Sequence, residues 1–146
     1  MIGIKDNQFN EPTDIYYKNK NLYICDCANK RIQIYSSNSD FAKSVKLDYE
    51  PWKIKATNSI VCVKGWLSKE IYFYNSVDFS VIQKYNHEIG RISQINSFFY
   101  EFNYLTNKVY CYDQNGILYE EISLNRTDLV LSNIYDGAFI GINDYL

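Results

Sequence analysis

The chain repeats itself at an interval of about 39 residues, and this periodicity constrains its fold more than any other feature. The clearest marker is Glu11-Pro12, which recurs as Glu50-Pro51. Two further segments recur at nearly the same spacing: NLYICD (21–26) as SIVCVK (59–64), and RIQIY (31–35) as EIYFY (70–74). A third copy opens at GRISQI (90–95), and a fourth begins at DLVLS (128–132). Regular repeats of this length are typical of folds in which similar units stack side by side.

Each copy is built from short runs of residues that suit β-strands. The first copy contains four such runs, at 13–17, 21–26, 31–35 and 41–46, separated by residues that favour turns. In the third run Ile32 and Ile34 alternate with polar or aromatic residues, which is the period of two expected of a strand. Asn115-Gly116 is a strong hairpin signal in the third copy. We therefore predict four antiparallel strands in each copy.

Four-stranded antiparallel units that repeat about every 40 residues are typical of β-propeller blades. We predict an all-β fold, a partial β-propeller with about three blades and part of a fourth. The blades are expected at 11–49, 50–89 and 90–126, with the partial blade at 127–146, and residues 1–10 are a candidate outer strand of a preceding or closing blade.

An open stack of blades leaves strand edges and apolar end faces unpaired, which is a liability for a free monomer. Three arrangements would remove that liability. The chain is part of a larger protein, which is the arrangement we favour, or it self-associates to close the propeller, or residues 1–6 complete a reduced fourth blade.

The alternation also predicts which side chains form the core between blades. The candidates are apolar residues at inward-facing strand positions: Ile24, Ile32, Ile34, Val61, Val63, Ile71, Phe73, Phe99, Val109 and Ile140. At the turn between the second and third strands of the first copy, we expect Asp26, Asn29 and Arg31 to form a hydrogen-bonded clasp.

The segment LYICDCANKRIQIY (22–35) resembles the core of an NHL repeat, which has a Leu-Tyr-Val strand, a turn rich in Asp and Asn, and then Arg-Ile-Gln. Pro12 and Asp40-Phe41 also stand where that repeat expects them. The second copy departs from the pattern, with Gly65 in place of Asp26 and Glu70 in place of Arg31. The resemblance implies a six-bladed propeller that recognises protein or RNA.

The turn that holds Cys27 in the first copy holds Trp66-Leu67 in the second and Tyr104-Leu105 in the third. Large apolar residues at repeated turn positions suggest a surface that binds a partner. Basic residues lie nearby in the sequence, namely Lys30, Arg31, Lys64 and Lys69. We expect a protein or peptide partner, such as an acidic peptide, with single-stranded RNA as the alternative. The competing interpretation is that Trp66 and Tyr104 simply pack over the adjacent blade.

The sequence gives little support for an enzyme. A metal-dependent lactonase- or lyase-like propeller would need carboxylates or histidines that converge on the axis, whereas the first strands offer Asp14, Lys53, Gln94 and Asp128. The single histidine, His87, stands beside Glu88 and is interpreted as a solvated turn residue. We therefore expect no catalytic residues, no metal and no cofactor.

Cysteine usage and hydropathy suggest the compartment. Cys25, Cys27, Cys62 and Cys111 are expected to be reduced thiols, because the chain begins without a recognisable secretory leader. No apolar run approaches the roughly 18 residues that a membrane-spanning helix needs. A cytoplasmic location without membrane contact is the resulting expectation. The net charge of −2 gives no general footprint for nucleic acid.

Overall fold

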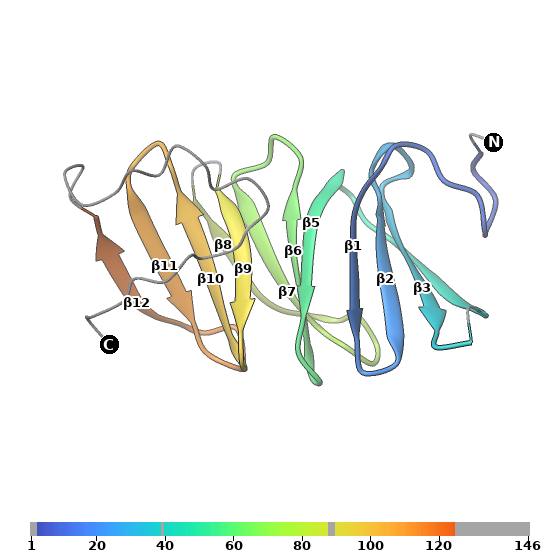
Figure 1. Ribbon diagram of the computed structural model, residues 1–146. Coiled ribbons are helices and arrows are strands. Elements are labelled where there is room, and N and C mark those ends of the chain that lie inside the picture. The colour runs from blue at the N-terminus through green and yellow to red at the C-terminus, as the bar shows by residue number, and fades with distance from the viewer. Residues whose placement is uncertain (1–2, 39, 88–89, 125–146) are drawn as a thin grey trace.

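The computed structural model describes residues 3–38, 40–87 and 90–124, and within these ranges it contains three four-stranded sheets (Figure 1). The first sheet is formed by β1 (Pro12–Lys18), β2 (Asn21–Asp26), β3 (Arg31–Ser36) and β4 (Phe41–Lys46), with a short 3-10 turn, η1 (Cys27–Asn29), between β2 and β3. The second contains β5 (Pro51–Ala56), β6 (Ile60–Gly65), β7 (Glu70–Asn75) and β8 (Val81–Asn86). The third contains β9 (Arg91–Ile95), β10 (Phe98–Asn103), β11 (Lys108–Tyr112) and β12 (Leu118–Ser123).

In every sheet the strand order follows the chain, and all neighbouring strands are antiparallel. The first strands of the sheets lie on the inside of the stack, where β5 contacts β1 on one side and β9 on the other (Figure 1). This is the arrangement of propeller blades, and the prediction of an all-β fold with three four-stranded blades is confirmed. The partial blade expected at 127–146 lies outside the described residues.

The link between β1 and β2 illustrates how local sequence sets the strand pairing. Asn19 and Lys20 form a two-residue turn, and both have positive φ angles, 53° and 63°. A tight hairpin whose two central residues have positive φ matches the right-handed twist of the flanking strands. Lys18 therefore pairs directly with Asn21, and the register continues along the hairpin to the bulge near Pro12.

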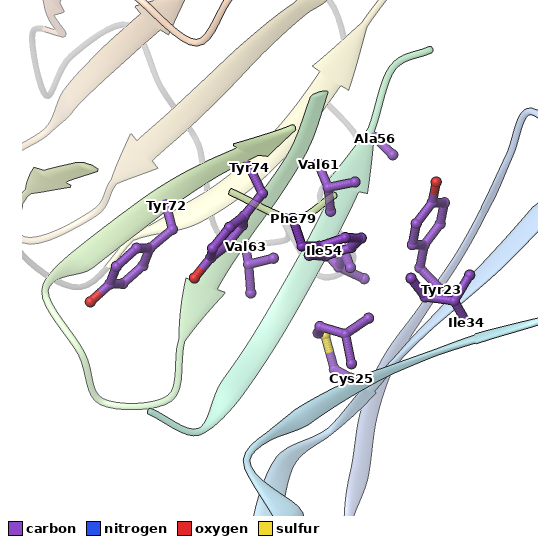
Figure 2. Close-up of a cluster of buried hydrophobic side chains, with 11 residues drawn as sticks. Tyr23, Cys25, Ile34, Ile54, Ala56, Val61, Val63, Tyr72, Tyr74 and Phe79 are labelled. Carbon is purple, nitrogen blue, oxygen red and sulfur yellow. The ribbon is translucent and has the colours of Figure 1, made fainter. Parts of the chain in front are cut away.

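The first two blades bury their facing sides in one hydrophobic core (Figure 2). The first blade contributes Tyr23, Cys25, Ile32 and Ile34, and the second contributes Ile54, Ala56, Val61, Val63, Tyr72, Tyr74 and Phe79. Burial of apolar area at about 25 cal/mol per Å² makes this contact a main source of stability, since neither sheet covers both of its faces alone.

A second core lies between the second and third blades, where Cys62, Ile71 and Phe73 meet Phe99 and Tyr112. The middle blade therefore has a partner on each side. Every residue of β6 is buried as a result, so this strand has no solvent face and shows no simple alternation.

Eight of the ten predicted core residues are buried, but Ile24 is only half-buried. Its neighbours Tyr23 and Cys25 face the second blade instead, and Ile24 points to the opposite side of the sheet, where it pairs with Ile15. The prediction took the most aliphatic residue of β2 as the inward one, whereas the pleat places an aromatic ring and a thiol there. Ile140 lies outside the described residues.

Residues 3–8 form bends and turns rather than the expected outer strand, and Phe9 makes an isolated bridge. The Gln8 amide donates to the Lys5 carbonyl at 3.2 Å, which closes a turn that an extended strand would not allow. The segment is held against the first blade by buried polar side chains, described below. The expectation of a strand in this part of the chain is therefore wrong.

Candidate partner-binding face

The turns that follow the second strand of each blade lie at one end of the stack, along the upper edge of Figure 1. We call this end the loop face, and define it by these turns, residues 27–30, 66–69 and 104–107, together with the link between β4 and β5 at 47–50. The backbone places equivalent residues of the first two blades alike: Cys27 N donates to Glu11 O at 3.3 Å, and Trp66 N donates to Glu50 O at 2.6 Å.

Four of the predicted site residues are large apolar side chains exposed on the loop face. The exposed fractions are 41% for Trp66, 69% for Leu67, 48% for Tyr104 and 61% for Leu105. They come in two pairs, one on the turn of the second blade and one on the turn of the third. Asn103 shapes the latter turn, because its side-chain oxygen accepts hydrogen bonds from the Leu105 and Thr106 amides.

The four predicted basic residues divide into two groups. Lys30 and Lys69 are exposed at the loop face, whereas Arg31 and Lys64 are only 5% and 1% exposed. The expectation that the latter two contact a partner is corrected, because each is buried in an ion pair inside the molecule. The loop face is consequently less basic than the sequence suggests.

Arg31 is the centre of the expected clasp, which the structure confirms. Its Nε donates to Asp26 Oδ2 at 2.6 Å, and Asn29 Nδ2 donates to the same oxygen at 2.9 Å. The two terminal guanidinium nitrogens of Arg31, Nη1 and Nη2, donate to the carbonyls of Ile4, Lys5 and Gln8 at 2.8–3.0 Å. The clasp therefore also holds the N-terminal segment against the first blade. The sequence predicted the side chains of the clasp but not its contact with this segment.

Lys64 belongs to a buried polar cluster between the second and third blades, which sequence reasoning missed. Lys64 Nζ lies 2.5 Å from Glu101 Oε1, and Tyr112 OH donates to Glu101 Oε2 at 2.9 Å. His87 Nδ1 lies 2.8 Å from the same Oε2, and its ring stacks on Tyr110 with centroids 3.7 Å apart. His87 is thus largely enclosed, and the interpretation as a solvated turn residue is wrong.

Burial would raise the pKa of Glu101, but the hydrogen bond with His87 and the charge of Lys64 outweigh it, so the net shift is downward. The carboxylate is therefore held ionised. Burial likewise raises the pKa of the Tyr112 hydroxyl, and the neighbouring Glu101 charge raises it further. A buried, ionised acid whose oxygens are all hydrogen-bonded to neighbouring side chains is typical of a structural cluster.

A small cleft opens at the loop face between the first and second blades. Its volume is about 170 Å³, and it is lined by Glu11, Thr13, Cys27, Ala28, Glu50, Trp52 and Trp66. The two indole rings meet with centroids 3.9 Å apart at an interplanar angle of 42°. Burial raises the pKa of the Cys27 thiol, and the charges of Glu50, Glu11 and Asp26 raise it further. The cleft is therefore a site of negative potential.

Sequence reasoning used Glu11 and Glu50 only as markers of the repeat, and it left Trp52 unassigned. A usable signal was present, however. Each glutamate directly precedes the proline at the start of a blade's first strand, so the two occupy equivalent positions on neighbouring blades. Neighbouring copies of one position lie near each other in a stack of blades.

The first-strand residues considered for catalysis form links between blades. Asp14 Oδ2 accepts a hydrogen bond from the Ile54 amide at 2.9 Å, and Asp14 Oδ1 lies 3.8 Å from Lys53 Nζ. Gln94 Oε1 accepts a hydrogen bond from Tyr16 OH at 2.6 Å. Asp128 lies outside the described residues. These contacts join the inner strands β1, β5 and β9 to one another.

The cysteines are buried and unpaired. Burial raises the pKa of the Cys25 and Cys62 thiols well above the ordinary value, which keeps both protonated and poorly nucleophilic.

Across residues 3–38, 40–87 and 90–124, no three His, Cys, Asp or Glu side chains are grouped closely enough to hold a metal ion. In the same ranges, no helix has the length and apolarity needed to cross a membrane.

Solved structures similar to this chain are propellers. BamB from Moraxella catarrhalis aligns with a TM-score of 0.59 and 8% identity, over 77% of this chain and 34% of that one. The Pan2 WD40 domain from Neurospora crassa aligns with a TM-score of 0.58 and 8% identity, over 77% of this chain and 39% of that one. Glutaminyl cyclase from Myxococcus xanthus aligns with a TM-score of 0.56 and 12% identity, over 77% of this chain and 52% of that one. At these identities the likeness concerns the fold alone, and the chain spans about a third to a half of each relative.

No curated protein sequence matches the chain. Residues 9–35 match the NHL repeat family, and this range holds β1, β2, the Asp26–Arg31 clasp and nearly all of β3. The matched range includes residues 22–35, the segment that resembles the core of an NHL repeat, and it contains the clasp. The chain thus carries an NHL repeat within a propeller-like fold.

Proposed function

We propose that this chain is a non-enzymatic binding module that recognises a protein or peptide through its loop face. The observation that carries the proposal is the exposure of Trp66 and Leu67 on one turn and of Tyr104 and Leu105 on the equivalent turn of the next blade. Aromatic side chains that are partly exposed on a rigid scaffold are typical centres of protein interfaces, because they bury much area at little entropic cost.

The charge distribution favours protein over RNA as the partner. A surface for single-stranded RNA combines stacking aromatic rings with a groove of lysine and arginine side chains. Here two of the four basic candidates are buried in ion pairs, and glutamates rather than basic residues stand beside Trp66. The loop face therefore has exposed aromatic rings on which bases could stack, but few of the basic side chains that an RNA site needs.

The proposal is tested by selecting binders from a random peptide library displayed on phage, with the purified chain as bait. Affinities of the enriched peptides are then compared for the parent, Trp66→Ala and Tyr104→Ala. Val77→Ala is the matched control, because Val77 is 79% exposed but lies in the β7–β8 turn at the opposite end of its blade. We expect each aromatic variant to lose about tenfold or more in affinity, and the control to bind as the parent does.

Two results would contradict the proposal. One is enrichment of no peptide, together with salt-dependent binding of single-stranded RNA oligonucleotides, which would favour the RNA alternative. The other is a loss of binding in the aromatic variants that merely follows a loss of folding. Thermal unfolding of each variant distinguishes that case, because a purely structural role predicts that both melt far below the parent.

A further inference from the structure

We propose that the cleft formed by Glu11, Glu50, Trp52 and Trp66 binds one cationic side chain, a lysine or an arginine, of a protein partner. This inference rests on the proposed function and specifies the chemistry of the partner. It follows from three properties of the cleft, namely its size, its charge and its aromatic wall.

The size of the cleft suits one side chain rather than a cofactor. Its volume of about 170 Å³ is below the range of roughly 300–1,000 Å³ typical of sites for drug-sized ligands. It corresponds to the space of about five or six water molecules at roughly 30 Å³ each. The end of one long side chain could replace that water.

The charge of the cleft selects a cation. Glu11 and Glu50 are the charged residues among those that line it. Within the described ranges, neither glutamate forms an ion pair with a lysine, arginine or histidine of the chain. The nearest basic neighbour in sequence, Lys53, does not line the cleft: its Nζ lies 3.8 Å from Asp14 Oδ1 in a different hollow, and 5.9 Å from the centroid of the Trp52 ring. Two carboxylates therefore remain available.

The aromatic wall adds a second attraction for the same kind of group. A cation within about 6 Å of an indole centroid is attracted by the ring quadrupole, by roughly 0.5–1 kcal/mol at exposed sites and more when water is excluded. Trp66 is 41% exposed and Trp52 is half-buried, so their rings are accessible from the loop face. The two rings pack on each other with centroids 3.9 Å apart and a tilt of 42°, so a partner's cation would contact an indole face that is turned away from the other ring.

The chain offers a direct readout, because its two tryptophans are Trp52 and Trp66. Tryptophan emission therefore reports on this cleft and on no other place in the molecule. The probes are three short peptides with one variable residue between glycines, carrying lysine, arginine or N-acetyl-lysine. The acetylated peptide keeps the length and most of the shape of lysine but carries no charge.

We expect the lysine or the arginine peptide to change tryptophan emission saturably, and the acetyl-lysine peptide to have no effect. The variant with Glu11→Gln and Glu50→Gln should bind the responding peptide about tenfold more weakly or worse, since it keeps the shape of the cleft and removes its charge. Glu120→Gln is the control, because Glu120 is an exposed acid on β12 in the third blade, and it should behave as the parent does.

An equal response to the acetylated peptide, or no saturable response to either charged peptide, would overturn the inference. Its failure is distinct from failure of the proposed function. If selected peptides depend on Trp66 and Tyr104 but ignore the glutamate substitutions, the binding module stands and the cation site is wrong. If a lysine peptide binds the cleft while the library yields nothing, the cation site stands without the wider interface.

Discussion

The buried pair of Lys64 and Glu101 should contribute strongly to the free energy of unfolding, and this contribution should depend on both partners being present. The two side chains are 1% and 0% exposed, and their charged atoms lie 2.5 Å apart between the second and third blades. Removal of one partner from a buried pair leaves an uncompensated charge, which typically costs about 3–5 kcal/mol. We therefore expect Lys64→Met to lower the free energy of unfolding by about that amount.

The double variant Lys64→Met with Glu101→Gln should be more stable than Lys64→Met alone, because no unpaired charge then remains. Urea unfolding followed by far-UV circular dichroism gives the four free energies of the cycle. A coupling of about 2–3 kcal/mol is expected for two groups in such contact. A domain of ordinary stability, about 5–15 kcal/mol, leaves enough range for the measurement.

The chain offers a matched control in Lys108 and Glu121. Their charged atoms are also 2.5 Å apart, but the side chains are 35% and 42% exposed. Lys108→Met should therefore change the free energy of unfolding by about 1 kcal/mol or less, as exposed ion pairs do. If Lys64→Met has no larger effect than Lys108→Met, or if the two changes in the buried pair simply add, the reasoning from burial is refuted.

The pKa of Glu101 is lowered in the folded state from an ordinary value of 4.5, so its stabilising contribution is present above that pH and is lost as pH falls through the lowered value. The urea midpoint should fall more steeply on acidification in the parent than in Glu101→Gln, and parallel curves would contradict this. Arg31→Ala removes the donors that hold the N-terminal segment, so trypsin should cleave after Lys5 faster than in the parent, and an unchanged rate would show that other contacts suffice. Gly116 has a φ angle of +74°, and a Cβ there would lie 2.6 Å from Phe73 Cγ, so Gly116→Ala should cost about 1–3 kcal/mol and lower the melting temperature by several degrees, whereas an unchanged melting temperature would mean that the turn adapts.

The strands were predictable because their signals are local. The alternation at Ile32 and Ile34 and the spacing of Glu11-Pro12 and Glu50-Pro51 carry the blade pattern within the sequence itself. The clasp was predictable for the same reason, since Asp26 and Arg31 are cross-strand neighbours joined by one short turn.

The inter-blade contacts were not predictable in this way. Glu101 is 37 residues from Lys64, and no pattern of spacing connects the two positions. Trp52 and Trp66 lie on different segments of one blade, and their contact depends on the way in which the turn after β6 folds back over β5. The inward position of Tyr23 rather than Ile24 follows from the register of the sheet, which apolar character alone does not determine.

The family match covers residues 9–35, and the polar cluster of this first blade differs from the one between the next two blades. In the first blade the charged partners Asp26 and Arg31 belong to the same repeat, so a description of one repeat contains the complete interaction. Between the next two blades the buried ion pair is that of Lys64 and Glu101, which belong to different repeats. The second and third blades thus keep the fold and share a charged interaction across their contact, while Asn103 still orders the turn within the third blade.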